Sequence, residues 1–456
     1  MSRPRLSPPE YPHASLFTDL YELTMLQAYW ANAMHEDAVF SLFVRKLPLE
    51  RNFLLACGLE DVLSYLEEVH FTPQALDYLD SLQTFDPDFL HWLSDFSFQG
   101  QVYALAEGTP CFANEPLVEI KAPIGQAQLL ETYLLNQIHV QTMLASKACR
   151  VVQAAAGRTV IDFGLRRIHG IDAGLKAARS FALAGVQATS NVLAGGTYGI
   201  PVSGTMAHSF IQAHDNEYEA LRAFARTFPQ TVLLVDTFDS LQGTKKVIQL
   251  ARELGEDFQI KGVRIDSSDL GALSFELRQE LDQAGLSQVS IFASGSLDEY
   301  VIDSLVRSGA PIKGFGVGTR MGVSNDAPYM DIVYKLSSYA GQGRMKTSSG
   351  KETLPHQKQV FRQEENGIST QDILAAWSEE HPGRPLLRQV MQDGRRLPAG
   401  RETLAEMQDR AQAEIAALPE DLRKVTPPSK AYPVQTSSYL QEEAARIKAA
   451  MTGKTG

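Results

Sequence analysis

His208 stands out because it ends a run of small and apolar residues. The stretch GIPVSGTMAHSF, residues 199–210, places it after Gly204, Thr205 and Ala207. A histidine in this setting can be a packed core residue, a metal ligand, a general base, or a residue that carries a group from one substrate to another. The residues around His208 leave all four interpretations open.

The stretch VRIDSSD, residues 263–269, places a cation and a carboxylate two positions apart. On a strand, Arg264 and Asp266 face the same side, so we expect both in one site. A carboxylate there can accept hydrogen bonds from vicinal hydroxyls, as on a ribose; a structural ion pair is the alternative. Asp236 and Asp239 are candidate Mg²⁺ ligands, but their spacing is not diagnostic.

Two glycine-rich stretches, 293–300 (ASGSLDEY) and 314–321 (GFGVGTRM), are candidate phosphate sites. Ser296 and Glu299 match a capping box, which predicts a helix start whose free N–H groups face an anion. Arg320 lies beside the second stretch. Ordinary strand-to-helix turns are the alternative, because short glycine patterns are weak signals. The residues expected at the phosphate are Gly295, Ser296, Gly316, Gly318 and Thr319.

The stretch DFGLRRIHG, residues 162–170, combines an aromatic face with a guanidinium group. Phe163 can stack on a planar ring, and Arg166 can hold a carboxylate through two parallel hydrogen bonds. We expect Arg167 and His169 to be solvated residues at a helix start.

Between residues 158 and 321, short apolar strands alternate with helical stretches, which predicts parallel βαβ units. Glycines that follow four of the helices are expected to have positive φ. We predict an α/β barrel, with an open doubly wound sheet as the alternative. Because the carboxyl ends of parallel strands meet at one edge, the polar strand ends form one ring, which indicates an enzyme. The predicted strands are 158–164, 185–191, 203–208, 230–239, 260–269, 287–296 and 312–321, and the glycines are Gly185, Gly255, Gly285 and Gly309.

The regular alternation occupies only the middle of the chain, which predicts three domains. Residues 1–115 form an N-terminal α/β domain, residues 116–340 the catalytic barrel, and residues 341–456 a C-terminal subdomain that packs on the first two. A long helical stretch, 125–155, opens the barrel segment.

Composition excludes several classes of protein. The formal net charge of −12 argues against a broad basic face for nucleic acid. No apolar run reaches the roughly 18 residues of a membrane span, and the N-terminus has no apolar segment typical of a secretory signal. The three cysteines have no metal-site spacing and fit a reducing compartment, so we expect a cytoplasmic protein.

A series of stretches, which follow one another over most of residues 15–340, resembles the nicotinate phosphoribosyltransferase family. From about residue 345 the match is weaker. The resemblance implies an irregular, type II phosphoribosyltransferase-like barrel, an N-terminal α/β domain, and a homodimer whose subunits share their active sites. The stretches include SLFTDLYELTMLQAYW (15–30), DFGLRR (162–167), GVQATSNVLAG (185–195), GTMAHSF (204–210), VDTFDS (235–240), GVRIDSSDL (262–270), ASGSLDEY (293–300) and GFGVGTRM (314–321).

The resemblance also implies a reaction. Nicotinate and 5-phosphoribosyl 1-pyrophosphate would give nicotinate mononucleotide and pyrophosphate, in NAD biosynthesis, with Mg²⁺ required and ATP as co-substrate of an ATP-coupled ligase. His208 would be phosphorylated by ATP, and the implied catalytic residues are His208, Asp266 and Arg264. Asp266 would hold ribose hydroxyls, Arg264 the pyrophosphate, and the two glycine-rich stretches the 5-phosphate. The implied nicotinate pocket consists of Tyr21 (from the neighbouring subunit), Phe163, Arg166 and Ser190.

Ser190 bears on the choice of substrate, because nicotinamide-using relatives have an acid at the comparable position. An acid there would repel the nicotinate carboxylate. The alternatives within the class are nicotinamide or quinolinate phosphoribosyltransferase. Outside it, an aldolase would need a lysine at a strand end, and none of the strand ends between residues 158 and 312 supplies one. A phosphate-binding isomerase and a metabolite-binding protein without activity complete the alternatives.

Overall fold

The computed structural model describes residues 6–7, 11–266, 269–348 and 350–451. The chain divides into two compact units. One consists of residues 1–7 and 147–326, and the other of residues 8–146 and 327–456. The domain boundaries predicted at residues 115 and 340 stay predictions. Among the described residues, no helix combines the length and the apolar character needed to cross a bilayer.

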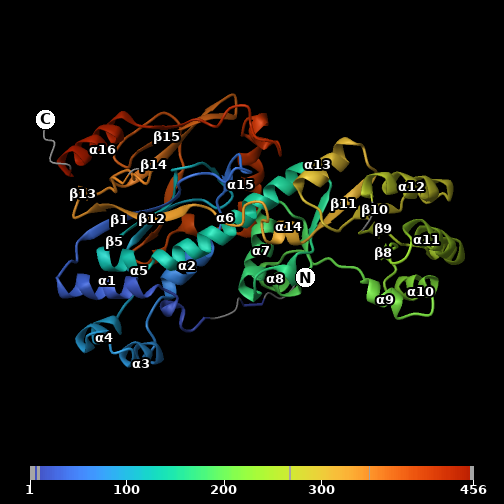
Figure 1. Ribbon diagram of the computed structural model, residues 1–456, viewed down its shortest axis with the longest axis horizontal. Coiled ribbons are helices and arrows are strands. Elements are labelled where there is room, and N and C mark those ends of the chain that lie inside the picture. The colour runs from blue at the N-terminus through green and yellow to red at the C-terminus, as the bar shows by residue number, and fades with distance from the viewer. Residues whose placement is uncertain (1–5, 8–10, 267–268, 349, 452–456) are drawn as a thin grey trace. The chain divides into compact units, whose positions relative to one another are not determined.

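The unit around residues 147–326 is built on a six-stranded parallel sheet in the order β7-β6-β11-β10-β9-β8 (Figure 1). The last strand, β11, pairs with the first, β6, so the sheet curls on itself and stays open between β7 and β8. The predicted parallel α/β barrel is therefore confirmed, in an open form. Its strands are β6 (Thr159–Asp162), β7 (Ala188–Thr189), β8 (Val232–Leu234), β9 (Gly262–Ile265), β10 (Ser290–Ala293) and β11 (Ile312–Val317).

The strand predicted over residues 203–208 is wrong. Only a single bridge joins Val202 to Thr189, and the segment that follows leads into a short helix that begins at His208. Gly204 and Pro201 interrupt this segment, so too little β-forming sequence remains for a ladder.

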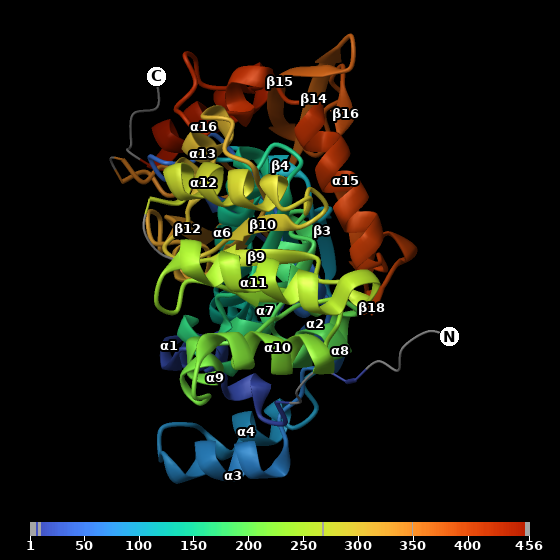
Figure 2. The ribbon, with the colours of Figure 1, turned by 90° about the vertical axis from the view of Figure 1, so that its right-hand side faces the viewer.

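Helices connect the strands of this unit. Helices α10, α11 and α12 pack side by side over strands β8, β9 and β10, as Figure 2 shows. The glycines predicted after four helices all have positive φ, between +54° and +100°. The helices are η2 (Leu165–Arg167), α7 (Ile171–Leu183), α8 (Val192–Tyr198), α9 (His208–Gln212), α10 (Glu217–Thr227), α11 (Ser240–Leu254), η3 (Gly255–Asp257), α12 (Leu270–Gln283), α13 (Glu299–Arg307) and α14 (Thr319–Gly322). Helix α6 (Glu131–Ala154) precedes them.

The second unit contains a seven-stranded sheet in the order β13-β12-β1-β5-β3-β17-β18, so distant parts of the sequence share one sheet. A four-stranded sheet, β16-β14-β15-β19, and the pair β2-β4 accompany it. The strands are β1 (Asp37–Val44), β2 (Leu54–Leu55), β3 (Gln101–Leu105), β4 (Pro110–Cys111), β5 (Pro116–Pro123), β12 (Ile332–Tyr339), β13 (Gln342–Gly343), β14 (Lys358–Glu365), β15 (Ile368–Ala376), β16 (Arg384–Pro385), β17 (Leu387–Gln392), β18 (Arg395–Arg396) and β19 (Val434–Thr436).

The helices of the second unit are mostly short. The long helical stretch predicted over residues 125–155 is present as α5 followed by α6. The others are η1 (Ala14–Leu16), α1 (Leu20–Ala31), α2 (Leu59–Glu68), α3 (Pro73–Ser81), α4 (Pro87–Leu93), α5 (Ile124–Leu129), η4 (Pro398–Gly400), α15 (Leu404–Ala416), η5 (Glu420–Arg423) and α16 (Ser438–Met451).

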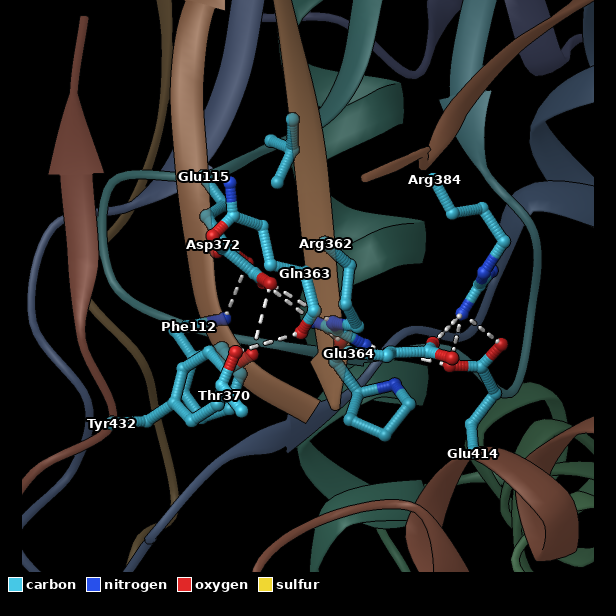
Figure 3. Close-up of polar contacts among 12 residues, drawn as sticks. Phe112, Glu115, Arg362, Gln363, Glu364, Thr370, Asp372, Arg384, Glu414 and Tyr432 are labelled. Atoms are coloured by element: carbon cyan, nitrogen blue, oxygen red, sulfur yellow. Dashed lines mark hydrogen bonds and ion pairs between the residues drawn. The ribbon is translucent and has the colours of Figure 1, made fainter. Parts of the chain in front are cut away.

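A buried polar network ties strands β14 and β15 of the second unit to the loop before β5 (Figure 3). The guanidinium of Arg362 donates to both carboxylate oxygens of Asp372, at 3.0 and 2.6 Å, and to the carbonyl oxygen of Pro110 at 2.9 Å. Glu115 lies fully buried beside Asp372, and the backbone N–H of Phe112 donates to it at 2.8 Å. Burial and the neighbouring Asp372 raise the pKa of Glu115 well above its ordinary value, so this carboxyl keeps its proton and can donate to Asp372.

This network predicts a specific dependence of stability on pH. Because the pKa of Glu115 is higher in the folded chain than in the unfolded chain, its contribution is complete below the unfolded pKa and is lost as pH rises through the folded value. Glu115→Gln keeps a hydrogen-bond donor and does not titrate. We expect its free energy of unfolding to fall less than that of the wild type from about pH 5 to about pH 9, measured by urea unfolding. Parallel curves for the two proteins would contradict the assignment.

Candidate active site

The residues predicted to do chemistry lie at or just beyond the carboxyl ends of the parallel strands. Phe163 follows β6, Ser190 follows β7, and Asp266 follows β9. The glycine-rich stretches lie at the last two strands in the sequence: Gly295 and Ser296 come after β10, Gly316 lies within β11, and Gly318 and Thr319 come after it. The structure thus places these residues at one edge of the sheet, while their chemical roles stay predictions.

Arg264 is the cation most firmly held at this edge. Its two terminal nitrogens donate to the hydroxyl of Thr205 at 2.8 Å and to the carbonyl oxygen of Met206 at 3.0 Å. Its guanidinium carbon lies 5.7 Å from the ring centroid of Phe163. Among the described residues, Arg264 Nε is buried without a hydrogen-bond partner. A donor left over in this way is available to a ligand.

No ion pair between Arg264 and Asp266 occurs among the described residues, so the structural ion pair considered above is not found there. The two residues still interact at longer range. Burial lowers the pKa of Arg264, while the nearby charges of Asp266 and Asp236 raise it, and Arg166 acts in the opposite sense. The backbone N–H of Asp266 donates to Asp236 Oδ2 at 2.7 Å, which links the segments that follow β8 and β9.

Two glycines at this edge are required by packing. A Cβ on Gly316 would lie 2.5 Å from two ring carbons of Phe163, and the backbone N–H of Phe163 donates to the carbonyl of Val317 at 2.8 Å. A Cβ on Gly295, whose φ is +84°, would lie 2.0 Å from the carbonyl oxygen of Asp266. Gly316 and Gly295 therefore allow Phe163 and Asp266 to occupy their positions. Their predicted part in phosphate binding stays a prediction.

Asp162, to which the sequence assigned no role, fixes the turns that carry the nicotinate-pocket candidates. It is buried and accepts hydrogen bonds from the backbone of Gly164 at 2.8 Å and from the hydroxyl of Thr189 at 2.7 Å. Its own carbonyl oxygen accepts from the backbone of Ser190 at 2.8 Å. Burial raises the pKa of Asp162, and the hydrogen bonds from the backbone N–H of Gly164 and the hydroxyl of Thr189 oppose this shift. Its signal in the sequence is a carboxylate at a strand end.

The two arginines after Phe163 differ. Arg166 is exposed in η2 and forms no hydrogen bond or ion pair with another residue that the structure describes. Arg167 is also exposed, but its guanidinium donates to the hydroxyl of Thr319 at 3.2 Å. Arg167 is thus solvated, as predicted, and it also holds Thr319, because η2 lies beside the start of α14.

His208 is the first residue of α9 and does not end a strand, which corrects the expectation above. Its side chain is half-buried, and its Nδ1 lies 3.1 Å from the hydroxyl of Thr237, just beyond β8. No group of three or more histidine, cysteine or acidic side chains that could hold a metal ion occurs in the described part of the chain. The hydroxyl of Thr237 instead orients the imidazole at the open side of the sheet.

The capping box predicted for Ser296 and Glu299 is wrong. Helix α13 is capped by Asp298, whose carboxylate accepts from two backbone N–H groups and also pairs with Arg320. Glu299 is fully buried and accepts from the ammonium of Lys147 at 2.6 Å. A buried ion pair with a residue this distant in sequence outweighs the local capping preference.

Tyr21 lies in the other unit, as the second residue of α1. Its side chain is 47% exposed, and burial, together with the charges of Glu131, Glu22 and Asp19, raises the pKa of its hydroxyl. The other predicted site residues belong to the unit that contains the parallel sheet.

Comparison with known proteins identifies relatives over most of the chain. Family models match residues 16–139 (nicotinate phosphoribosyltransferase N-terminal domain), 159–375 (nicotinate phosphoribosyltransferase family) and 381–443 (C-terminal domain). Nicotinate phosphoribosyltransferase pncB2 of Mycobacterium tuberculosis is 52% identical over 96% of this chain and 95% of its own length. The Bacillus subtilis nicotinate phosphoribosyltransferase is 39% identical over 82% of this chain and 78% of its own length.

Solved structures of related proteins resemble the whole chain as well. The crystal structure of human nicotinic acid phosphoribosyltransferase superposes with a TM-score of 0.83 at 28% identity, covering 94% of this chain and 99% of that one. Nicotinate-nucleotide pyrophosphorylase from Pyrococcus furiosus superposes with a TM-score of 0.74 at 22% identity, covering 91% and 99%, which shows a shared fold.

The contact between Gly316 and Phe163 can be tested by unfolding. We expect Gly316→Ala to destabilise the protein by about 1–3 kcal/mol, because the added methyl group overlaps the ring. In a Phe163→Ala background the same change should cost much less, which is measured as a double-mutant cycle by urea unfolding. Gly271→Ala on α12, whose Cβ would meet no atom closer than 3.3 Å, is the control. Additive effects of the two substitutions would show that the contact is not formed.

Proposed function

Since the chain belongs to the nicotinate phosphoribosyltransferase family, we propose that it joins nicotinate to 5-phosphoribosyl 1-pyrophosphate in NAD biosynthesis. The pyridine nitrogen of nicotinate forms a bond to C1 of the ribose, and the bond from C1 to the pyrophosphate oxygen breaks. Nicotinate mononucleotide and pyrophosphate are the products. Such a reaction needs positioning and stabilisation of the leaving group more than acid–base chemistry.

The observation that carries this proposal is the arrangement around Phe163. An aromatic ring packs against the bare backbone of Gly316 on one side and lies beside the guanidinium of Arg264. The exposed Arg166 follows three residues later, without a partner among the described residues. Phe163 can stack on a pyridine ring while Arg166 holds its carboxylate. Arg264 then faces the position of the pyrophosphate through its unpaired Nε.

In this proposal the ribose and the 5-phosphate of the second substrate bind at the ends of β9, β10 and β11. Asp266 accepts hydrogen bonds from the ribose hydroxyls in this proposal. The 5-phosphate lies against the glycine-rich ends of the last two strands, at Gly295, Ser296, Gly316, Gly318 and Thr319. Arg167 supports the proposed phosphate-binding residues, because it donates a hydrogen bond to the hydroxyl of Thr319.

Magnesium is part of the proposal as a companion of the pyrophosphate. Mg²⁺ commonly binds one or two carboxylates and otherwise waters and substrate phosphates, so a dedicated protein cage is not needed. Asp236 and Asp266, whose segments the hydrogen bond from the Asp266 backbone links, would hold it. When bound, the metal neutralises charge on the leaving group.

His208 is the proposed acceptor of the terminal phosphoryl group of ATP. In that step a bond forms between an imidazole nitrogen and phosphorus, the bond to the bridging oxygen of ATP breaks, and ADP leaves. Hydrolysis of the phosphohistidine returns the imidazole and releases phosphate. The hydroxyl of Thr237 contacts Nδ1 and holds the ring in one orientation. The segment before His208 also contacts Arg264, through Thr205 and Met206.

A homodimer that completes each site with Tyr21 of the neighbouring subunit is also proposed. Its support is the half-exposed ring of Tyr21 on a segment far in sequence from the strand ends. A cytoplasmic location fits the three cysteines, which are buried and form no disulfide among the described residues.

Substrate choice is the point at which the alternatives differ. Ser190 places no acid beside the proposed carboxylate pocket, which favours nicotinate over nicotinamide. Quinolinate carries a second carboxylate and would need a further basic cluster. The deciding experiment offers nicotinate, nicotinamide and quinolinate separately, with the sugar pyrophosphate, and identifies the mononucleotide formed. Turnover of nicotinamide or quinolinate in preference to nicotinate would overturn the proposal.

Arg166 should act on nicotinate and not on the sugar. We expect Arg166→Ala to raise the KM for nicotinate by about 10–100-fold, because it removes charge-assisted hydrogen bonds worth roughly 1.5–3 kcal/mol. The KM for the sugar pyrophosphate should change much less. Arg167→Ala, which removes the adjacent exposed guanidinium, is the control and should leave the nicotinate KM close to that of the wild type. An unaltered nicotinate KM in Arg166→Ala would remove this residue from the pocket.

His208 should be required for ATP coupling. We expect His208→Ala to lose nicotinate-dependent ATP hydrolysis while slow formation of the mononucleotide without ATP persists. Wild-type protein incubated with labelled ATP should carry acid-labile, base-stable phosphate. His214→Ala is the matched control, because the ring of His214 contacts the carbonyl oxygen of Phe210 at 2.8 Å and not the strand ends. Normal coupling in His208→Ala, or label on a hydroxyl residue, would refute this role.

A further inference from the structure

The turn after β10 has a strained backbone, which other contacts must hold in place. Gly295 and Ser296 are consecutive residues with positive φ, at +84° and +48°. Glycine adopts this left-handed region freely, but a residue with a side chain, such as Ser296, does so at a cost in free energy. Such a conformation persists where the surrounding structure fixes it. Here Asp298 and Glu299, which follow the turn at once, each bind a partner elsewhere in the sequence.

Asp298 joins this turn to the turn after β11. Its Oδ1 accepts from the backbone N–H groups of Tyr300 and Val301, at 3.1 and 2.9 Å, and so caps α13. Its Oδ2 forms an ion pair with the guanidinium of Arg320, the second residue of α14. Asp298 is buried, so the carboxylate side of this ion pair is shielded from water. One side chain therefore connects the two glycine-rich stretches.

Glu299 anchors the segment that contains Arg320 at its other end. The ammonium of Lys147 donates to Glu299 Oε2 at 2.6 Å and lies 2.7 Å from Asp326 Oδ1. Lys147 and Glu299 are almost completely buried. Residues 320–326 are thus tied at their start to Asp298 and at their end, through Lys147, to Glu299. Because the buried contact fixes the end of this segment, the ion pair with Asp298 is the contact that fixes its start.

The charge of Arg320 is therefore balanced within the unit. An arginine beside a glycine-rich stretch can bind a phosphate directly, as its five N–H donors allow. A guanidinium that pairs with a carboxylate attracts a phosphate less than an unpaired one, since the carboxylate repels the same anion. The contact between Arg320 and Asp298 thus favours a role in holding the turns over a role as a phosphate ligand.

We propose that Asp298 is a positioning residue, which holds the two glycine-rich turns together through Arg320 and thereby preforms the binding site for the 5-phosphate of the sugar substrate. This inference rests on the proposed function, which places that phosphate at these turns. Asp298 does not touch the phosphate, because its two oxygens are used by α13 and by Arg320. The ion pair orders the turns before the substrate arrives, so binding does not have to order them. Loss of the ion pair should therefore weaken binding of the sugar pyrophosphate and leave binding of nicotinate unaffected.

The central experiment is a double-mutant cycle read out as two Michaelis constants. Asp298→Asn keeps an oxygen that can cap α13, because asparagine caps helices as well as aspartate does, but it removes the charge that pairs with Arg320. Arg320→Gln removes the cation. We expect each to raise the KM for the sugar pyrophosphate by about 3–10-fold, with the nicotinate KM close to that of the wild type. The double variant should be no worse than the more affected single variant, because both substitutions break the same ion pair. Arg320→Lys, which keeps the charge, should fall between Arg320→Gln and the wild type.

The direction of the effect of Asp298→Asn separates positioning from direct binding by Arg320. If Arg320 were a ligand of the phosphate, this substitution would free its guanidinium and remove a negative charge nearby, so the KM for the sugar pyrophosphate would fall. The positioning role predicts a rise in this KM. A fall, or additive effects in the cycle, would overturn the positioning role.

A second arginine–carboxylate pair in the same unit supplies the matched control. Arg222 Nε on α10 donates to Glu253 Oε1 on α11 at 2.7 Å, so this pair also joins two neighbouring elements. We expect Glu253→Gln to change neither Michaelis constant. A rise in the KM for the sugar pyrophosphate in this control, or equal increases in both constants in Asp298→Asn, would overturn the positioning role, because they would indicate general damage to the unit.

Ser296→Asp tests the proposed place of the phosphate separately. Ser296 is exposed, and aspartate tolerates a left-handed backbone, so the substitution adds a negative charge at the turn. If the 5-phosphate lies there, repulsion between like charges should raise the KM for the sugar pyrophosphate by about 10-fold or more. If Ser296→Asp and Asp298→Asn both leave this KM unchanged, the phosphate binds elsewhere, and the proposed phosphate site and the positioning role both fail. If only Ser296→Asp raises it, the phosphate site stands and the positioning role of Asp298 is overturned.

Discussion

The close approach of β11 to β6 is the constraint on which the candidate site depends. Where these strands pair, Gly316 offers no side chain, and the ring of Phe163 fills that space at the carboxyl end of the sheet. The ring in turn lies beside the guanidinium of Arg264, which comes from β9, two strands beyond β11 in the order of the sheet. An L side chain at position 316 would push the ring outward and separate it from Arg264. The pairing that curls the sheet therefore also sets the geometry of the candidate pocket.

A buried carboxylate stabilises the turns on either side of this contact. Burying an ionised Asp162 costs free energy unless hydrogen bonds replace its hydration, and Gly164 and Thr189 supply them. Both donors belong to the segments that carry candidate site residues, so the hydrogen bonds that compensate the buried charge also fix Phe163 and the backbone of Ser190. The position of a site residue at this edge is therefore set by polar contacts below it as well as by the strand that precedes it.

The sequence predicts those parts of the structure that depend on local pattern. Short apolar runs between helical stretches identified six of the seven predicted parallel strands, and Gly185 and Gly309 were placed correctly as residues with positive φ after helices. Neighbouring residues are enough to indicate these features. Contacts between distant residues were not predictable. Glu299 matches a capping pattern but pairs with Lys147, and Arg167 looks solvated but holds Thr319. The register between strands determines at which position a side chain would overlap a neighbour, so that glycine is required there, and the sequence does not reveal this register.

The segment before His208 shows what the open side of the sheet makes possible. A regular seventh strand would use its backbone groups in a ladder, whereas here the hydroxyl of Thr205 and the carbonyl oxygen of Met206 accept from Arg264. Two of the three nitrogens of that guanidinium are thereby committed to the segment that ends at His208. The Nε–H, which has no partner among the described residues, and the second hydrogens of the two terminal nitrogens remain for an anion that approaches Arg264. In the mechanism that we propose, charge added at His208 and an anion bound at Arg264 would act on the same short segment, and this shared segment would couple phosphorylation to binding of the pyrophosphate.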